Sequence, residues 1–312
     1  MSTCSVELLA IGHASYDLTL FVDEFPRENS KLETYEMLEH GGGPAANAAY
    51  LLSLWGVNCG FAGLVGNDLY GQRVSDELRS AGVDLSLTEI RPSHVTPLSV
   101  ILVNTCNGSR TIVNRKEMNA ALQLHESQLE QADPRLLLFD GHEPEASHLA
   151  LHALPGAVSI LDAGSLRTGT EELAGKVSYL VASEHFALQA TGLANLADQE
   201  TQRKCLRQLR GRARADARLV VTLGERGLIY EEAGAFCHLP AFPVHPVDTT
   251  GAGDTFHGAF AFGILRGLSL HETLRLASMA AALSVQRRGG RPSIPALAEV
   301  QKELAQCSTT QL

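Results

Sequence analysis

The stretch DTTGAGD (Asp248–Asp254) stands directly before a helix-forming run that begins at Thr255. Small residues at a helix start leave backbone N–H groups free, and such groups bind anions. A carboxylate at Asp254, beside the bound anion, can take a proton from a hydroxyl group while the amides stabilise the charge of a transferred group. The alternative is purely structural, because an acidic residue in a first helical turn also interacts favourably with the helix dipole.

A second glycine-rich stretch, GGGPAAN (Gly41–Asn47), precedes another expected helix, Ala45–Trp55. Its small residues let a ligand approach the backbone closely. It lacks the Gly-Lys-Ser/Thr ending that a P-loop needs, so it does not indicate a Walker-type nucleotidase.

Short apolar runs alternate with longer helical patterns along the chain. Several of these runs are continuously apolar, which is typical of strands buried on both faces of a parallel sheet. The expected strands are Val6–Ile11, Cys59–Val65, Val100–Val103, Leu136–Phe139, Val158–Leu161, Val177–Val181 and Leu219–Leu223. The other expected helices are Gly71–Ala81, Glu143–Ala153, Glu200–Arg210, Thr255–Arg266 and His271–Gln286. This alternation predicts a doubly wound α/β architecture within a single domain over residues 1–312.

Two stretches do not fit the alternation. Residues 17–40 contain alternating apolar positions and a turn, and residues 98–114 predict a hairpin whose turn is Asn107-Gly108. Alternation indicates one wet face, so we expect a small sheet from about residues 15–40 and 97–115 that acts as a lid beside the main sheet.

Composition excludes several classes of protein. The formal net charge of −10 disfavours sequence-independent binding of nucleic acid. No apolar run approaches a membrane span, and the first residues lack the basic start of a signal peptide. The six cysteines, Cys4 among them, show no paired spacing. We therefore expect a cytoplasmic protein with reduced thiols and no nucleic-acid or membrane partner.

Some charged side chains can be interpreted either as solvent-exposed residues without a specific role or as functional residues. His148 and His152 lie one helical turn apart and are either a solvated pair or metal ligands. The simplest interpretation of the basic run from Arg203 to Arg214 is a solvent-exposed helix face. Arg110, Arg115 and Lys116 are surface charge by default, although an anionic substrate would need one of them or Lys31.

Three segments together resemble the ribokinase family of sugar kinases, also called the PfkB family. They are Asp248–Asp254, Gly41–Asn47 and Gly289–Pro295, and the likeness runs from Gly12 to Pro295. The resemblance implies a mostly parallel sheet of nine or ten strands with helices on both faces and a β lid. It also implies ATP-dependent transfer of the γ-phosphate to a hydroxyl of a sugar such as a ketose or pentose, with Mg²⁺ accompanying the ATP.

The site residues that follow are implied by the resemblance alone. Asp254 matches the catalytic base, and Gly251, Ala252 and Gly253 match the anion hole. The positions that match sugar contacts are Asp17, Gly42, Gly43 and Asn47. The positions that match ATP contacts are Thr222, Gly224, Gly227 and Ser278. The positions that match a monovalent-cation site, for example for K⁺, are Asp248, Thr250 and Ser293.

One motif departs from the family. Where an Asn-x-x-Glu motif linked to Mg²⁺ is expected, the chain has Ser183-Glu184-His185-Phe186, and Glu184 is left to reach the metal through water. This variant and the Gly-Gly-Gly-Pro-Ala-Ala stretch look like the sulfofructose kinase branch, in which Lys31 and Asn114 would approach an anionic substrate end. An arginine of that branch is expected just after Asp140, but Gly141-His142 stands there.

Other functions compete with a simple sugar kinase. A sulfofructose or sugar-phosphate kinase and a nucleoside kinase of the same family are the enzyme alternatives. A sugar sensor without catalytic activity would also retain the fold. A dinucleotide dehydrogenase is disfavoured, because the first strand is not followed by G-x-G-x-x-G. Lid strands often pair between subunits in this family, which implies a homodimer.

Overall fold

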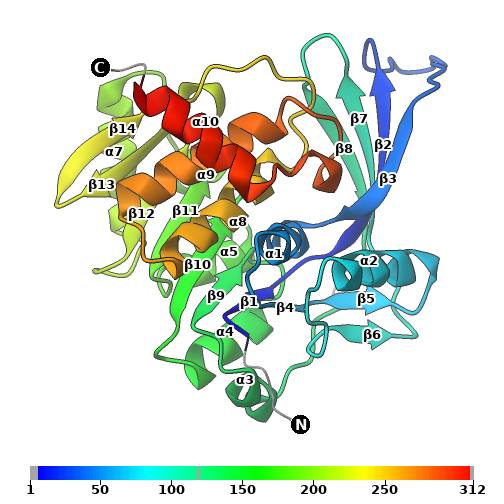
Figure 1. Ribbon diagram of the computed structural model, residues 1–312, viewed down its shortest axis with the longest axis horizontal. Coiled ribbons are helices and arrows are strands. Elements are labelled where there is room, and N and C mark those ends of the chain that lie inside the picture. The colour runs from blue at the N-terminus through cyan, green and yellow to red at the C-terminus, as the bar shows by residue number, and fades with distance from the viewer. Residues whose placement is uncertain (1–5, 118–119, 310–312) are drawn as a thin grey trace.

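The computed structural model describes residues 6–117 and 120–309. Within them, eight strands form the main sheet in the order β14-β13-β12-β11-β10-β9-β1-β4 (Figure 1). The strands are β1 (Leu8–Ile11), β4 (Cys59–Ala62), β9 (Leu136–Phe139), β10 (Val158–Ala163), β11 (Tyr179–Ser183), β12 (Arg218–Thr222), β13 (Leu228–Glu232) and β14 (Ala235–Leu239). The first six pair in parallel, and β13 and β14 extend the sheet antiparallel.

Helices cover both faces of this sheet, as the sequence predicts (Figure 1). Successive residues of β1 point to opposite faces: Leu8 and Ala10 belong to one buried cluster and Leu9 and Ile11 to another. The first cluster includes side chains of α1 (Pro44–Leu54), α2 (Leu69–Ser80), α8 (Ala252–Leu265), α9 (Leu270–Ser284) and α10 (Leu297–Thr309). The second includes side chains of α3 (Glu126–Ala132), α4 (Pro144–Ala153), α5 (Thr168–Ala174), α6 (Glu184–Thr191) and α7 (Gln199–Arg210).

The two misfit stretches form the predicted lid. Its four strands have the order β3-β2-β7-β8 and stand to one side of the main sheet (Figure 1). They are β2 (Ser15–Val22), β3 (Met37–Gly42), β7 (Leu98–Asn104) and β8 (Arg110–Arg115). The β7–β8 turn contains the predicted Asn107-Gly108, with Gly108 at φ 69°. Phe21, Ile101 and Val103 form a small core of the lid's own.

Some expected boundaries were wrong. The expected strand Cys59–Val65 is two strands, because the chain leaves the main sheet after β4 and β5 (Leu64–Gly66) pairs with β6 (Glu89–Arg91). Helix α8 starts at Ala252 rather than Thr255, since Gly251 adopts the left-handed conformation that lets the helix begin there. The main sheet has eight strands among the described residues, where nine or ten were implied. Cys4 lies outside the described residues, and the five other cysteines are free thiols.

Candidate active site

Asp254 lies in the first turn of α8, where the sequence placed a catalytic carboxylate. Because α8 begins at Ala252, Asp254 is its third residue. Its Oδ2 accepts a hydrogen bond of 2.6 Å from Asn47 Nδ2, 207 positions earlier in the chain. Burial raises the pKa of Asp254, while the Asn47 hydrogen bond and nearby His257 and Arg110 act to lower it. A raised pKa makes the Asp254 carboxylate a stronger proton acceptor.

The orientation of the Asn47 amide is set by a buried arginine that sequence reasoning missed. Arg291 Nε donates to Asn47 Oδ1 at 2.9 Å, and its Nη1 donates to Glu77 Oε2 at 2.8 Å. A guanidinium can only donate, so Oδ1 must face Arg291 and Nδ2 must face Asp254. Arg291 is 2% exposed, and its burial lowers the pKa of the guanidinium. Its place in the stretch Gly289–Pro295, predicted as part of the family signature, was the one available signal.

A second buried contact fastens the first turn of α8 to the sheet. His257 Nδ1 lies 2.7 Å from the carbonyl oxygen of Gly253 and 3.2 Å from Asp162 Oδ2. Its Nε2 lies 3.2 Å from the carbonyl oxygen of Val181. Burial raises the pKa of Asp162 to about 6. The glycine turn before Asp254 is therefore tied to both β10 and β11.

The predicted sugar-contacting residues Asp17, Gly42 and Gly43 lie together with Asn47. The Asp17 side chain is buried on β2 and accepts a 2.8 Å hydrogen bond from the Ser15 hydroxyl. A Cβ at Gly42 would lie 2.0 Å from Asp17 Oδ2, so any side chain there would displace the Asp17 carboxylate. At Gly43, which has φ 95°, a Cβ would lie 2.3 Å from the carbonyl oxygen of His13.

The two residues expected near an anionic substrate end lie differently. Asn114 on β8 is opposite Ser99, which is in turn opposite Asp17, so it belongs to the same row of the lid. The Lys31 side chain is 86% exposed in the segment between β2 and β3 and faces Glu33 at 3.6 Å. The structure thus brings Asn114, but not Lys31, into line with Asp17.

A cavity of about 770 Å³ opens on the other side of the glycine turn. It is lined by all four predicted ATP-contacting residues, Thr222, Gly224, Gly227 and Ser278, and by Ala252 and Gly253 of the predicted anion hole. A Cβ at Gly227 would lie 2.0 Å from the carbonyl oxygen of Leu239, so glycine is required there as well. Sequence reasoning missed the apolar wall, which includes Phe242, Val244, Ala281 and Val285.

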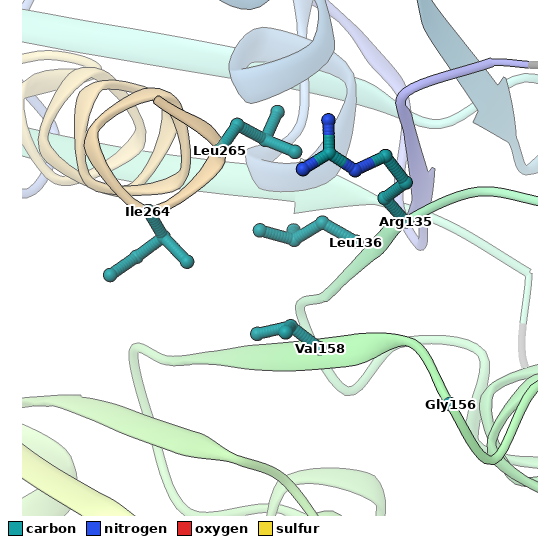
Figure 2. A pocket seen from close by; sticks show the side chains of 6 residues that line it. All are labelled: Arg135, Leu136, Gly156, Val158, Ile264 and Leu265. Carbon is teal, nitrogen blue, oxygen red and sulfur yellow. The ribbon is translucent and has the colours of Figure 1, made fainter. Parts of the chain in front are cut away.

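A cavity of about 280 Å³ lies at the opposite end of α8 (Figure 2). Leu136, Val158, Ile264 and Leu265 point toward it, and Arg135 is its one charged lining residue among the described residues. Without a carboxylate, histidine or thiol in its lining, it has no groups for catalysis.

The three residues predicted to hold a monovalent cation lie close together. Asp248 accepts hydrogen bonds of 2.8 Å from the amides of Thr250 and Gly289. Ser293 Oγ donates to the carbonyl oxygen of Gly290 at 2.7 Å. Thr250 Oγ1 is buried without a hydrogen-bond partner. An orphaned hydroxyl oxygen beside a carboxylate and a carbonyl oxygen fits the oxygen ligands that alkali and alkaline-earth cations prefer.

The segment that replaces the Asn-x-x-Glu motif serves the fold. Ser183 caps α6, since its Oγ accepts a 3.0 Å hydrogen bond from the amide of Phe186. Glu184 Oε2 accepts a hydrogen bond of 2.5 Å from Arg226 Nη2, so this carboxylate already has an ionic partner. Within residues 6–117 and 120–309, no three His, Cys, Asp or Glu side chains gather closely enough to hold a metal ion. His148, which the sequence offered as one of two metal ligands, instead contacts Glu172, with its Nε2 at 2.9 Å from Glu172 Oε2.

Comparison with known proteins identifies the family. The sequence matches the pfkB family of carbohydrate kinases over residues 6–297. The chain belongs to this family. It is 30% identical to a ribokinase of Bacillus subtilis over 310 residues, covering 96% of this chain and 99% of that protein. It is 28% identical to an ATP-dependent ribose-1-phosphate kinase of Halopiger xanaduensis, with coverage of 96% and 99%.

The fold is that of the pfkB family. An Arabidopsis thaliana ribokinase whose structure was solved with ribose and ATP superposes with a TM-score of 0.82 at 26% identity, over 96% of this chain and 99% of that one. The protein is thus a ribokinase-like carbohydrate kinase, and the resemblance stated from the sequence is confirmed. No helix among the residues described has the length and apolarity to cross a membrane.

The ion pair between half-buried Glu77 and buried Arg291 gives a first prediction, for which the neighbouring residue on α2 is a matched control. Replacing Glu77 with Gln leaves a buried guanidinium without its counter-ion, and we expect the free energy of unfolding to fall by about 3–5 kcal/mol. Asp76 pairs with Arg79 at the exposed surface, so Asp76→Asn is expected to change it by less than about 1 kcal/mol. Urea unfolding measures both. Equal effects would contradict the assigned role of Glu77.

Proposed function

We propose that the protein phosphorylates a primary hydroxyl group of a sugar, a ketose or a pentose, with ATP as donor and Asp254 as general base. One observation carries this proposal. Asp254 stands at a glycine turn whose amides open to the 770 Å³ cavity, while its carboxylate is bonded to Asn47 of the sugar-contacting set. ATP in that cavity and a sugar beside Asp17 would meet at Asp254.

In this mechanism Asp254 takes the proton of the sugar hydroxyl. The hydroxyl oxygen forms a bond to the γ-phosphorus, and the bond from that phosphorus to the oxygen bridging it to the β-phosphate breaks, which releases ADP. The backbone N–H groups of Gly251, Ala252 and Gly253 stabilise the charge on the transferred phosphoryl group, that of Ala252 after giving up its 3.4 Å hydrogen bond to the carbonyl oxygen of Thr249. Asp17 and Asn47 hold the sugar hydroxyls, which turns the reaction between two substrates into one between positioned groups.

In this proposal, cations neutralise the phosphate groups of ATP. Mg²⁺ bound with the nucleotide supplies neutralisation of the phosphate charge. Arg110 reaches from the lid, where its Nη1 donates to Thr249 Oγ1 at 2.8 Å and its side chain lines the nucleotide cavity. We assign Glu184 no more than a water-mediated contact to Mg²⁺, since Arg226 holds its carboxylate.

A prediction tests the base directly. Asp254→Asn keeps the shape of the side chain but cannot accept the proton, and we expect kcat to fall about 10²- to 10⁴-fold. ADP release is measured over a panel of pentoses, hexoses, ketose phosphates and nucleosides, and nucleotide binding is measured separately by calorimetry. Retained nucleotide binding with more than about 1% of the original kcat would exclude Asp254 as base.

The Asn47 hydrogen bond predicts a change in pH dependence. This bond acts to lower the pKa of Asp254, so Asn47→Ala raises that pKa further. The base works in its deprotonated form, and the acid limb of the kcat/KM profile should therefore move to higher pH. Asn195→Ala, at an exposed position, should leave the limb in place. An unmoved limb in Asn47→Ala with lower activity would mean that Asn47 contacts only sugar.

We further propose that Asp248, Thr250 and Ser293 hold K⁺. Support comes from the buried Thr250 hydroxyl oxygen, which has no hydrogen-bond partner. K⁺ is expected to raise kcat/KM roughly 5- to 150-fold over tetramethylammonium, the range of a typical coupling between two sites. Thr250→Val should reduce that activation. Equal rates in both salts would contradict the site.

A homodimer through the lid is our proposal for the assembly. Strand β8 is an edge of the lid sheet, and its Ile112 and Val113 are exposed by 43% and 66%. Exposed apolar residues on an unpaired edge favour pairing with a second strand.

A further inference from the structure

Three loops at the carboxyl edge of the sheet bring together side chains that the mechanism above does not use. His13 follows β1, His142 follows β9 and Arg167 follows β10. The rings of His13 and His142 stack with centroids 4.5 Å apart. Arg167 Nη1 donates to His142 Nε2, and its Nη2 donates to Ser165 Oγ at 2.6 Å. We call these four residues, His13, His142, Ser165 and Arg167, the Arg167 cluster.

The Arg167 cluster borders the proposed sugar site. Asp140 Oδ2 accepts hydrogen bonds from the amide of His13 at 2.8 Å and from the amide of Ala45 at 3.2 Å. It thereby joins the loop after β1 to the start of α1. The carbonyl oxygen of His13 lies against Gly43, one of the predicted sugar-contacting residues. A sugar held beside Gly42 and Gly43 would therefore have the Arg167 cluster as a neighbour.

The guanidinium in this cluster lacks a counter-ion. No ion pair among the described residues includes Arg167, although its side chain is only half-exposed. Two carboxylates beside the cluster are engaged with other groups, although Asp162 also interacts electrostatically with Arg167. Asp140 accepts three backbone amides, and Asp162 contacts His257. By contrast, the buried Arg291 has Glu77. Because its hydrogen-bond partners are all neutral and it makes no direct ion pair, this half-buried guanidinium still has charge and donors for an anionic ligand.

The two histidine rings add no negative charge, and Asp162 and Asp140, which act on Arg167 and His13 from outside the cluster, are held by other groups. Burial lowers the pKa of both His13 and His142 to about 3, and the positive charges of Arg167 and Lys116 act in the same direction. Both rings are therefore uncharged at neutral pH. Because Arg167 only donates, Nε2 of His142 is an acceptor and its Nδ1 carries the hydrogen. The cluster therefore presents a positive charge and several N–H donors. Such an arrangement can bind a carboxylate, phosphate or sulfonate group.

We propose that the Arg167 cluster binds an anionic group carried by the acceptor, so that the sugar substrate is a sugar acid, sugar phosphate or sugar sulfonate. This inference rests on the proposed kinase function and narrows its substrate. The anionic group would lie at Arg167 and the reacting hydroxyl at Asp254, which fixes the orientation of the sugar between them. The cation that the sequence lacks directly after Asp140 is thus supplied from the loop after β10.

The test compares anionic sugars with their neutral parents. ADP release is measured with fructose against fructose 1-phosphate, fructose 6-phosphate and 6-deoxy-6-sulfofructose, and with glucose against gluconate. We expect at least one anionic sugar to exceed its parent about a hundredfold in kcat/KM. Arg167→Gln should remove about a hundredfold for that sugar and change its neutral parent less than threefold. Arg167→Lys, which keeps the charge but not the planar fork, should restore part of the loss.

Controls separate the possible outcomes. Arg212→Gln, in an exposed ion pair with Glu171, should leave all values unchanged, and thermal unfolding checks that each variant is folded. A preference for neutral sugars, or an equal loss for both sugars in Arg167→Gln, would overturn the proposal. If no sugar releases ADP, the kinase assignment fails. Calorimetric binding of the same sugars then decides whether the Arg167 cluster binds an anionic group. Tighter binding of an anionic sugar that Arg167→Gln abolishes would support the cluster, and its absence would refute it.

Discussion

The hydrogen bond between Asn47 and Asp254 is the contact on which the arrangement of the site depends. It joins the start of α1 to the start of α8 across 207 residues of sequence. Its geometry is imposed by Arg291, whose Nε can only donate to Asn47 Oδ1. Glu77 compensates the charge of Arg291 and also accepts the amide of Gly41 at the end of lid strand β3. Asp254, the proposed base, is thus joined to the lid and to the last loop of the fold by one connected set of polar groups, of which Asn47 and Arg291 are buried and Asp254 and Glu77 half-buried.

Burying this set of polar groups costs free energy, and that cost limits which residues around the set can be substituted. Removing one member would leave another charged or polar group without a partner in a region closed to water. The glycines around it are constrained for a different reason. A side chain at Gly41 would overlap Arg291, and one at Gly42 would overlap Asp17. The glycine-rich stretch therefore serves close packing against these charged side chains as well as access for a ligand.

The site has two sides of unlike character. On the side proposed for the nucleotide, an apolar wall and the glycine turn line a large cavity. On the sugar side, carboxylates, amides, histidines and Arg167 gather at the ends of the parallel strands, where loops from separate strands meet. Asp254 lies at the boundary between the two. With a net charge of −10, this chain can bind ATP and the proposed anionic sugar there only by concentrating positive potential locally, through helix N-termini and single cations such as Arg110 and Arg167.

Much of this protein was determined by its sequence alone. Continuous apolar strands and amphipathic helices specified the α/β layers, because burial on one or two faces imposes the period of the pattern. The Asn107-Gly108 turn specified the lid hairpin, and the two glycine stretches indicated where the proposed base and the proposed nucleotide site lie. Boundaries that depend on one conformation, such as the start of α8 at a left-handed Gly251, were displaced by three residues.

Only the tertiary structure decided which distant charges meet. Glu77, His257 and Arg167 carry no local pattern, and the place of Arg291 in Gly289–Pro295 does not name its partners, since those partners lie on other elements. Three-dimensional packing pairs the guanidinium of Arg291 with Glu77. It also places the guanidinium of Arg167 beside neutral histidines. Sequence periodicity reports which face of an element is buried, but not which charged group a buried side chain will find there.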